Sequence, residues 1–291
     1  MSFGHVLSDF TGPVRVGEAS VAVDREAGEV LVAEARDVRV FNHVGMQLFG
    51  FRTPRNLAGV LDLAVEADGN LITLALDLDA PGDRPRVVIT RHNFRGIPVE
   101  EIIVSGAPPP FDGMQPNTVF SRGEKLILAN TGDMIATVVD PQGTFERGYD
   151  LAEILEIPEE DRDSLEITGL AIDDAGNLLI TCAILFSAFV VSPEGELVAI
   201  WGEPGSIPGT FGVASGIARD ASGRTYVADK GRGVVMVFDQ QYKFLQEFGH
   251  ELTVAGRVGM PSEVFVDGAG RVYLTQVGRR GVWVYNVRTV E

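Results

Sequence analysis

The chain has 291 residues, 45% of them apolar, and a formal net charge of −17 at pH 7 from 24 basic and 41 acidic residues. This composition is typical of a soluble globular protein with a large core, and the charge argues against a nucleic-acid partner, because phosphate binding needs a dense basic surface. No apolar run approaches the roughly 18 residues that cross a membrane, and the single cysteine, Cys182, excludes an internal disulfide.

A turn glycine between two short strand patterns recurs along the whole chain. The residues beside it alternate in character, as in Arg224–Ala228, which indicates a strand rather than a helix. The successive spacings are 41, 54, 53, 47 and 47 residues, a period typical of propellers with four strands per repeat. We therefore predict an all-β fold, a six-bladed β-propeller with four-stranded antiparallel blades, as one domain over residues 1–291. The six turn glycines are Gly28, Gly69, Gly123, Gly176, Gly223 and Gly270.

The N-terminal segment is expected to complete the last blade. Gly4 followed six residues later by Phe10 repeats the spacing of Gly195 and Trp201 in a fourth strand, and only residues 286–291 follow the third strand of the last repeat. We predict that Val6–Phe10, within a closing segment of residues 4–10, is the missing outer strand, since an open ring would leave a strand edge unpaired. Burial of Phe10 would then stabilise the fold by roughly 1.5–3 kcal/mol.

Three long connections interrupt the repeats, at Asp77–Pro85, Asp150–Glu166 and Glu203–Phe211. In a four-stranded meander these connections leave the same rim, and binding loops are generally elaborated on one face of a rigid scaffold. We expect any site on this rim, the alternative being neutral insertions. Within the second connection, Leu151–Leu155 is expected to form one helical turn. The blades are expected at residues 18–51, 60–104, 116–149, 167–202, 214–249 and 261–286.

Three short motifs link the repeats to a known family. They are the YVAD of Tyr226–Asp229, the VFD of Val237–Asp239 and the closing FG of Phe248 and Gly249. On these motifs the chain resembles the NHL-repeat family of six-bladed β-propellers over essentially its whole length. The resemblance implies a non-catalytic binding or scaffold module.

The connection Asp150–Glu166 carries eight acidic residues against the single base Arg162. Such a patch steers a basic protein partner or collects cations, whereas the plainer interpretation is a solvated loop that keeps the protein in solution. We predict that the rim binds a protein partner through Asp150, Glu153, Glu156, Glu159, Glu160, Asp161 and Asp163.

The stretches GEASVAVDREAGEVLVAE and PNTVFS also resemble the regucalcin and gluconolactonase propellers. Those enzymes hold a divalent metal with a glutamate, two asparagines and an aspartate. Glu18 matches the glutamate and Asn117 one asparagine, but Thr168 and Ser215 stand at the other two positions. The resemblance implies a lactonase-like hydrolase or lyase with a divalent cation such as calcium. Calcium takes six to eight oxygen ligands, and one carboxylate with an amide and two hydroxyls is a poor set for it. No cofactor is therefore firmly predicted.

The first strands are expected to begin near the axis of the ring, at Glu18, Leu61, Asn117, Thr168, Ser215 and Ser262. A second ring is expected where the second strands end, at Glu34, Asn130, Cys182, Asp229 and Gln276, with Leu74 interrupting it. The residues of the second ring are expected to cap turns and bond to neighbouring blades, the alternative being a polar ligand pocket. The polar residues expected at the channel mouth are Thr168, Ser215, Ser262, Glu34, Asn130, Asp229 and Gln276.

Two functions therefore compete: a binding propeller with an acidic rim, and a metal-dependent hydrolase or lyase. A third alternative is that the propeller is one subunit of a larger assembly. The start of the chain has neither the basic residues nor the apolar middle of a signal peptide. This favours the cytoplasm, with a mature secreted or periplasmic chain as the alternative.

Overall fold

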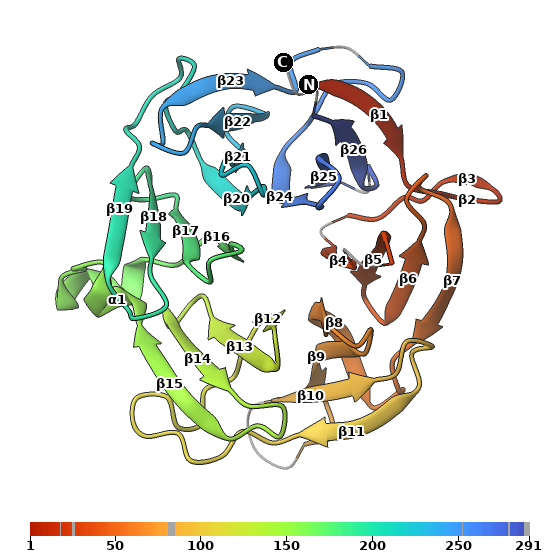
Figure 1. Cartoon of the computed structure of the whole chain (residues 1–291), viewed down its shortest axis with the longest axis vertical. Helices are drawn as coiled ribbons and strands as arrows, with labels where there is room; N and C mark the ends of the chain where they lie inside the picture. The colour runs from red at the N-terminus through yellow and green to blue at the C-terminus, as the bar shows by residue number, and fades with distance from the viewer. Residues whose placement is uncertain (18, 25–26, 81–84, 252, 279, 288–291) are drawn as a thin grey trace. The chain divides into compact units, whose positions relative to one another are not determined.

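The computed structural model describes residues 1–17, 19–24, 27–80, 85–251, 253–278 and 280–287. Its regular structure is almost entirely β, in six four-stranded antiparallel sheets and one two-stranded hairpin. Each large sheet is a meander of strands that follow one another along the chain, except where the N-terminus adds a strand (Figure 1). This confirms the predicted fold, a six-bladed β-propeller. No helix within the described ranges has the length and apolar character needed to cross a membrane.

The chain divides into two compact units, and the first of them is Ala19–Ile157. It holds three of the four-stranded sheets and the short helix α1, which packs against β14 and β15. The elements are β4 (Ser20–Asp24), β5 (Glu29–Glu34), β6 (Asp37–Phe41), β7 (Gln47–Arg52), β8 (Leu57–Val65), β9 (Leu71–Asp77), β10 (Arg86–His92), β11 (Pro98–Ile102), β12 (Thr118–Arg122), β13 (Lys125–Asn130), β14 (Ile135–Val139), β15 (Phe145–Asp150) and α1 (Leu151–Ile154).

The second unit combines Met1–Glu18 with Pro158–Glu291 and holds the other three sheets. It also contains the 3₁₀ helix η1 and the hairpin of β2 and β3. The elements are β1 (Ser2–Val6), β2 (Ser8–Asp9), β3 (Gly12–Pro13), η1 (Glu159–Ser164), β16 (Gly169–Ile172), β17 (Leu178–Cys182), β18 (Ser187–Val191), β19 (Leu197–Trp201), β20 (Ala214–Arg219), β21 (Thr225–Asp229), β22 (Val234–Phe238), β23 (Phe244–Phe248), β24 (Pro261–Val266), β25 (Arg271–Gln276) and β26 (Trp283–Asn286).

In three blades an aspartate closes the turn between the first two strands. In the β20–β21 hairpin, Asp220 Oδ1 accepts hydrogen bonds from the backbone N–H of Ser222 (3.0 Å) and Arg224 (2.9 Å). Gly223 follows with φ +79°, a conformation that costs a glycine little. Asp173 and Asp267 make the same bonds in their own blades. The recurring turn glycine of the sequence is thus one part of a repeated turn.

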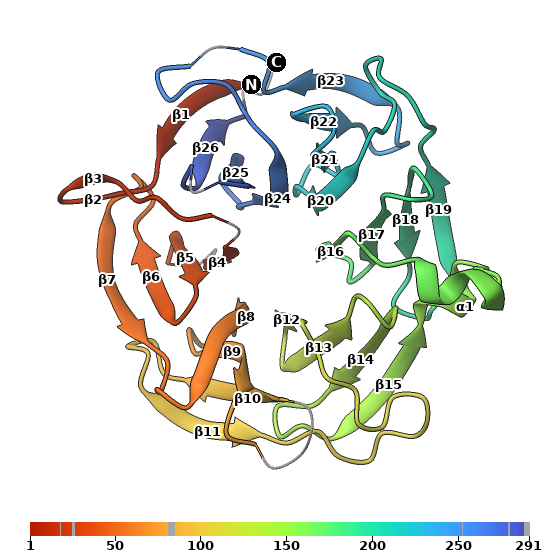
Figure 2. The same ribbon diagram turned by 180° about the vertical axis from the view of Figure 1, so that it is seen from behind.

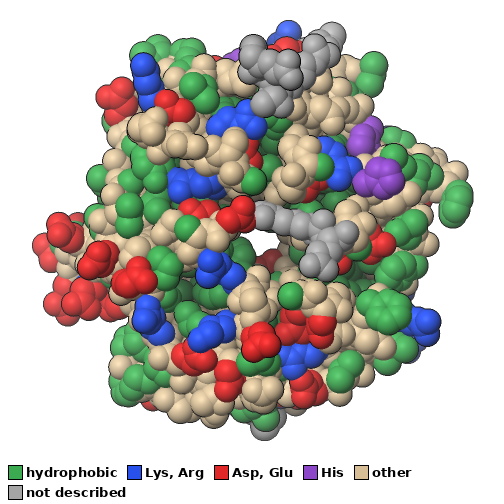
Figure 3. Space-filling model, viewed as in Figure 1, with side chains coloured by type: hydrophobic (Ala, Val, Ile, Leu, Met, Phe, Trp, Pro, Cys, Tyr) green, Lys and Arg blue, Asp and Glu red, His purple; other side chains and the backbone are tan. Residues whose placement is uncertain are grey.

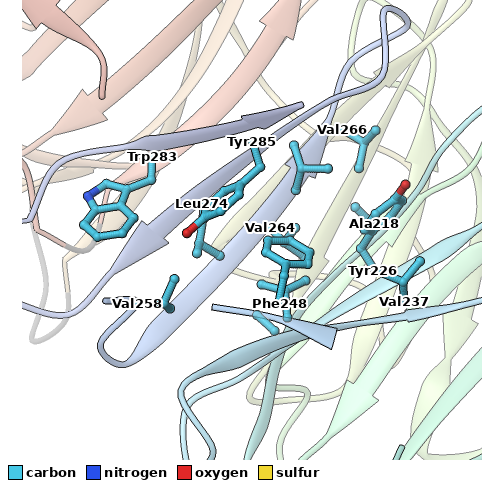
Figure 4. Packing of buried hydrophobic residues seen from close by; sticks show 13 residues of the cluster. Ala218, Tyr226, Val237, Phe248, Val258, Val264, Val266, Leu274, Trp283 and Tyr285 are labelled. Atoms are coloured by element: carbon cyan, nitrogen blue, oxygen red, sulfur yellow. The ribbon is translucent and has the colours of Figure 1, made fainter. Parts of the chain in front are cut away.

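Apolar side chains fill the space between neighbouring sheets. Close approach is needed where the first strands meet: a Cβ added to Gly216 of β20 would lie 2.6 Å from the Cα of Glu263 in β24. Further out, the rings of Phe248 and Tyr285 lie 4.8 Å apart between their centroids. Figure 4 shows this cluster, with Ala218, Tyr226, Val237 and Phe248 from one sheet and Val264, Val266, Leu274, Trp283 and Tyr285 from the next.

The N-terminal strand completes the last sheet, as predicted, but with other residues. β1 pairs antiparallel with β26, placing Phe3 opposite Tyr285 and Val6 opposite Trp283; Figures 1 and 2 show the two strands side by side. The ring of Phe3 packs edge-on, 5.4 Å from Trp283 and 5.6 Å from Tyr285 between ring centroids.

The predicted bounds Val6–Phe10 of this outer strand are wrong beyond Val6, which ends β1. Ser8 and Asp9 form β2, which pairs with β3, and Phe10 lies at the tip of this hairpin with 96% of its surface exposed. Phe10 therefore contributes none of the expected burial energy. The aromatic anchor lies before Gly4 rather than six residues after it, and a register shift between Phe3 and His5 separates this strand from the regular pattern.

Candidate functional site

Hydroxyl side chains join the innermost strands of the unit that contains β16–β26. Thr168 Oγ1 donates to the carbonyl oxygen of Ala214 in the next sheet (2.9 Å). Ser215, which is buried, donates in turn to the carbonyl oxygen of Pro261 in the sheet after that (3.0 Å). Ser262 bonds Thr275 within its own sheet (2.8 Å between hydroxyl oxygens). These three predicted residues therefore hold neighbouring strands together and are committed to protein partners.

Two residues at the ends of second strands fix the loop that precedes their own blade. Asp229 is fully buried, and its carboxylate accepts from the backbone N–H of Gly212 (2.7 Å), Val213 (3.0 Å) and Arg232 (2.9 Å). At the matching position, Gln276 Oε1 accepts from a backbone N–H, that of Gly259, at 2.8 Å. Both side chains act as loop anchors, which agrees with the plainer of the two interpretations.

In the unit Ala19–Ile157, the two predicted asparagines also bond to nearby chain. Asn117 is exposed; its amide donates to Thr131 Oγ1 (2.8 Å), and its carbonyl oxygen accepts from the N–H of the same threonine (3.1 Å). Asn130 caps the turn after β13 by accepting from the N–H of Gly132 (3.0 Å). Glu34 ends β5 opposite Asp37.

Glu18, the other predicted metal ligand, lies outside the described residues. Among the residues that the structure does describe, no group of three or more His, Cys, Asp or Glu side chains could hold a metal ion. Asn117 also points both of its side-chain polar atoms at Thr131. The metal site predicted at Glu18 and Asn117 therefore stays a prediction.

Asp62 in β8 is a polar residue of the inner strands that sequence reasoning missed. Its carboxylate accepts from Ser20 Oγ in β4 and from the backbone N–H of Val119 in β12 (2.8 Å), so it joins three successive sheets. Burial raises the pKa of Asp62 to about 6, although the hydrogen bonds that it accepts act in the opposite direction. From the repeat pattern Leu61 was expected at this place, and the signal for Asp62 was a single acid in an apolar run.

The acidic segment Asp150–Glu166 has structure in both of its halves. In the first half, Asp150 caps α1 by accepting from the N–H of Glu153 (2.9 Å). Leu151 and Leu155 are buried, while Glu153 and Glu156 are exposed. The helical turn was predicted, and Asp150 serves as its N-cap.

The second half forms η1 after Pro158, an element that the sequence did not predict. Leu165 and Ile167 are buried behind it. Figure 3 shows acidic side chains gathered at the molecular edge where Figure 1 labels α1. The exposed acids of η1 are Glu159, Glu160, Asp161 and Asp163.

No protein-family model matches this chain, and no curated protein matches it. Solved structures do resemble it. A protein of unknown function from Bacteroides thetaiotaomicron is 14% identical with a TM-score of 0.65, over 97% of this chain and 75% of that one. A streptogramin B lyase is 13% identical with a TM-score of 0.60, over 94% of both chains. The WD40 β-propeller domain of Doa1 is 12% identical with a TM-score of 0.56, over 93% of this chain and 79% of that one. At these identities the likeness is one of fold, and what this chain shares with these proteins is the β-propeller architecture.

Proposed function

We propose that this chain is a non-catalytic binding propeller that presents the acidic segment Asp150–Glu166 to a basic protein partner. The observation that carries the proposal is that exposed acids stand on backbone anchored by buried apolar residues. In the first half Leu151 and Leu155 provide the anchor, and in the second half Leu165 and Ile167 do so. A loop that served only to solvate the protein would not need such anchors.

Charge and chain entropy both support this role. The side chains of η1 are held on a short helix, so less ordering remains to be done when a partner binds. Four acids within five residues attract a basic surface at long range and speed its association. Propellers with WD40 repeats share the fold, as the domain of Doa1 does.

The test compares two charge-neutralised variants of equal size. In the first, Glu159→Gln, Glu160→Gln, Asp161→Asn and Asp163→Asn remove the acids of η1. In the control, Glu124→Gln, Glu194→Gln, Glu196→Gln and Glu203→Gln remove four other exposed acids. Wild type and control should retain the same basic protein from a lysate, and the η1 variant should lose it.

Retention should also weaken with salt, because the Debye length falls from about 30 Å at 0.01 M to about 8 Å at 0.15 M ionic strength. Equal retention by all three proteins, or equal loss in both variants, would contradict a specific role for the segment.

A metal-dependent hydrolase or lyase is the second candidate. The observation in its favour is the likeness in fold to a streptogramin B lyase over 94% of both chains. The predicted ligands Glu18 and Asn117 stay a prediction, since Glu18 lies outside the described residues and Asn117 is bonded to Thr131.

Thermal melts test this candidate directly. A cation held at 100 times its dissociation constant would stabilise the fold by about 2.7 kcal/mol. Melts in EDTA and then in calcium, manganese and zinc, on wild type and Glu18→Gln, should reveal a rise that the substitution abolishes. Unchanged melting with all three metals would remove this candidate.

A further inference from the structure

An open pocket of about 380 Å³ lies among three loop segments of the unit that contains β20–β26. Its walls come from the β21–β22 turn, from the residues just after β23, and from the residues just before β24. Three cationic side chains line it, Lys230, Arg232 and Arg257, together with His250. Such a concentration of bases stands out in a chain with 24 basic and 41 acidic residues.

Two bases at the pocket already have acidic partners. The Arg232 guanidinium donates to both carboxylate oxygens of Glu247, at 2.9 and 2.7 Å, and His250 Nε2 lies 2.8 Å from the same carboxylate. Glu247 is thus committed to these two side chains. The second acid nearby, Glu251, accepts from the backbone N–H of Gly249 (3.0 Å).

Two arginines at the same place have no acidic partner among the described residues. Arg257 is exposed on the pocket wall. Arg280 is also exposed; its guanidinium lies over the ring of Trp283, 5.5 Å from the centroid, and 2.5 Å from where a Cβ of Gly259 would stand. Gly259 is itself a wall residue. Arg232 and His250 share Glu247, and neither Arg257 nor Arg280 is paired with an acid among the described residues, so the charge of these two arginines is available to a ligand.

Glycines give the pocket its backbone walls. A Cβ on Gly233 would lie 2.9 Å from the carbonyl oxygen of Gly259, and one on Gly249 would lie 3.0 Å from that of Gly233. Larger residues would force these loops apart. Val258 and Met260 add an apolar portion to the wall.

From this arrangement we infer that the pocket binds a small organic anion. A phosphate or carboxylate group lies against Arg257 and Arg280, and the less polar remainder packs on Val258 and Met260. Guanidinium groups bind both oxyanions through paired, charge-assisted hydrogen bonds. The volume falls within the usual range of small-molecule sites, roughly 300–1,000 Å³. The site shares no residue with the acidic segment, so it does not depend on the proposed function.

Calorimetric titration with pyrophosphate and with citrate, at constant ionic strength, tests the inference. Wild type should bind at least one probe in the millimolar range or tighter, and Arg257→Gln should weaken that binding about tenfold, the value of one charge-assisted hydrogen bond. Arg257→Lys should fall between the two, because lysine keeps the charge and loses the planar fork.

The control is Arg55→Gln, which removes one positive charge from an exposed position in the other unit. It should leave binding of both probes unchanged. The inference is overturned if neither probe binds wild type at millimolar concentration, or if Arg55→Gln and Arg257→Gln weaken binding equally, since the attraction would then come from charge in general.

Discussion

Polar side chains within the sheets bond to neighbouring strands rather than to an open channel. Asp62 does so in the unit Ala19–Ile157 and Ser215 in the other unit, each reaching the first strand of a neighbouring blade. The two differ in their electrostatic consequence. A buried hydroxyl such as that of Ser215 loses little when it is hydrogen-bonded. The half-buried carboxylate of Asp62 must either keep its proton or remain charged in a poorly solvated place.

The raised pKa of Asp62 predicts a pH-dependent stability. The unfolded chain releases this proton near pH 3.8 and the folded chain near pH 6, so the free energy of unfolding should fall as pH rises from about 4 to about 6. The contribution lost is on the order of 3 kcal/mol, and it stays lost above that window. The asparagine in Asp62→Asn does not titrate, so the variant does not show this loss of stability. The stability of the variant relative to wild type should therefore increase as pH rises from about 4 to about 6. Urea denaturation of both proteins between pH 4 and 8 measures this difference.

The exposed Asp112 supplies the control, because Asp112→Asn changes the same chemical group without a buried carboxylate. Its stability difference from wild type should be constant across the pH range. Parallel curves for Asp62→Asn and wild type would show that this carboxylate does not titrate near pH 6 in the folded protein.

Asp62 also marks the limit of what the sequence could reveal at this scale. The pairing of β8 with β9 shifts register between Val60 and Asp62, so the side-chain alternation does not continue through Leu61. The alternation of side chains along a strand, with its period of two residues, does not reveal such a register shift. Counting back along the strand therefore placed Leu61, rather than Asp62, near the axis of the ring. Bonding partners of Asn117 and Ser215 were equally out of reach, because they depend on segments distant in the chain or on side-chain rotation.

At the scale of elements, turn chemistry decides which strands a sequence can predict. The strand pattern at Arg224–Ala228 lies within one residue of β21, because aspartate and glycine turns separate the strands of that blade. β1 lacks such a marker on its N-terminal side. The hairpin of β2 and β3 turns at Thr11, whose N–H donates to Asp9 (2.7 Å), a local feature that the repeat period does not contain.

Two phenylalanines of the same segment give a matched test of β1. Phe3 packs on Trp283 and Tyr285, and Phe10 is almost fully exposed. Phe3→Ala should lower the free energy of unfolding by about 2 kcal/mol, since an aromatic contact and buried area are both lost. Phe10→Ala should leave it unchanged. Chemical denaturation of the two variants measures both values, and equal effects would contradict the observed register of β1 on β26.

At the scale of the whole molecule, the repeat period was enough to predict the fold. Six similar turns at propeller spacing determine six blades, whatever the details of each strand. The prediction that residues 1–291 form a single domain stays a prediction. The basic pocket was not predictable, because Lys230 and Arg257 come from separate loops and line one pocket only after folding. The net charge of −17 is a property of the whole chain, so it gives no indication of a local group of basic residues.

The pairing of β1 with β26 has a consequence for biosynthesis. Ser2–Val6 is translated before every other strand of its sheet, whereas its partner Trp283–Asn286 is translated only after all the strands of the other five sheets. The other five sheets are each made of strands that are contiguous in the chain and can form during elongation. The sixth sheet can be completed only after β26 has left the ribosome. Until then Phe3 cannot pack on Trp283 and Tyr285. A chain that stops early therefore leaves its first strand without a partner, in a form open to proteases and chaperones.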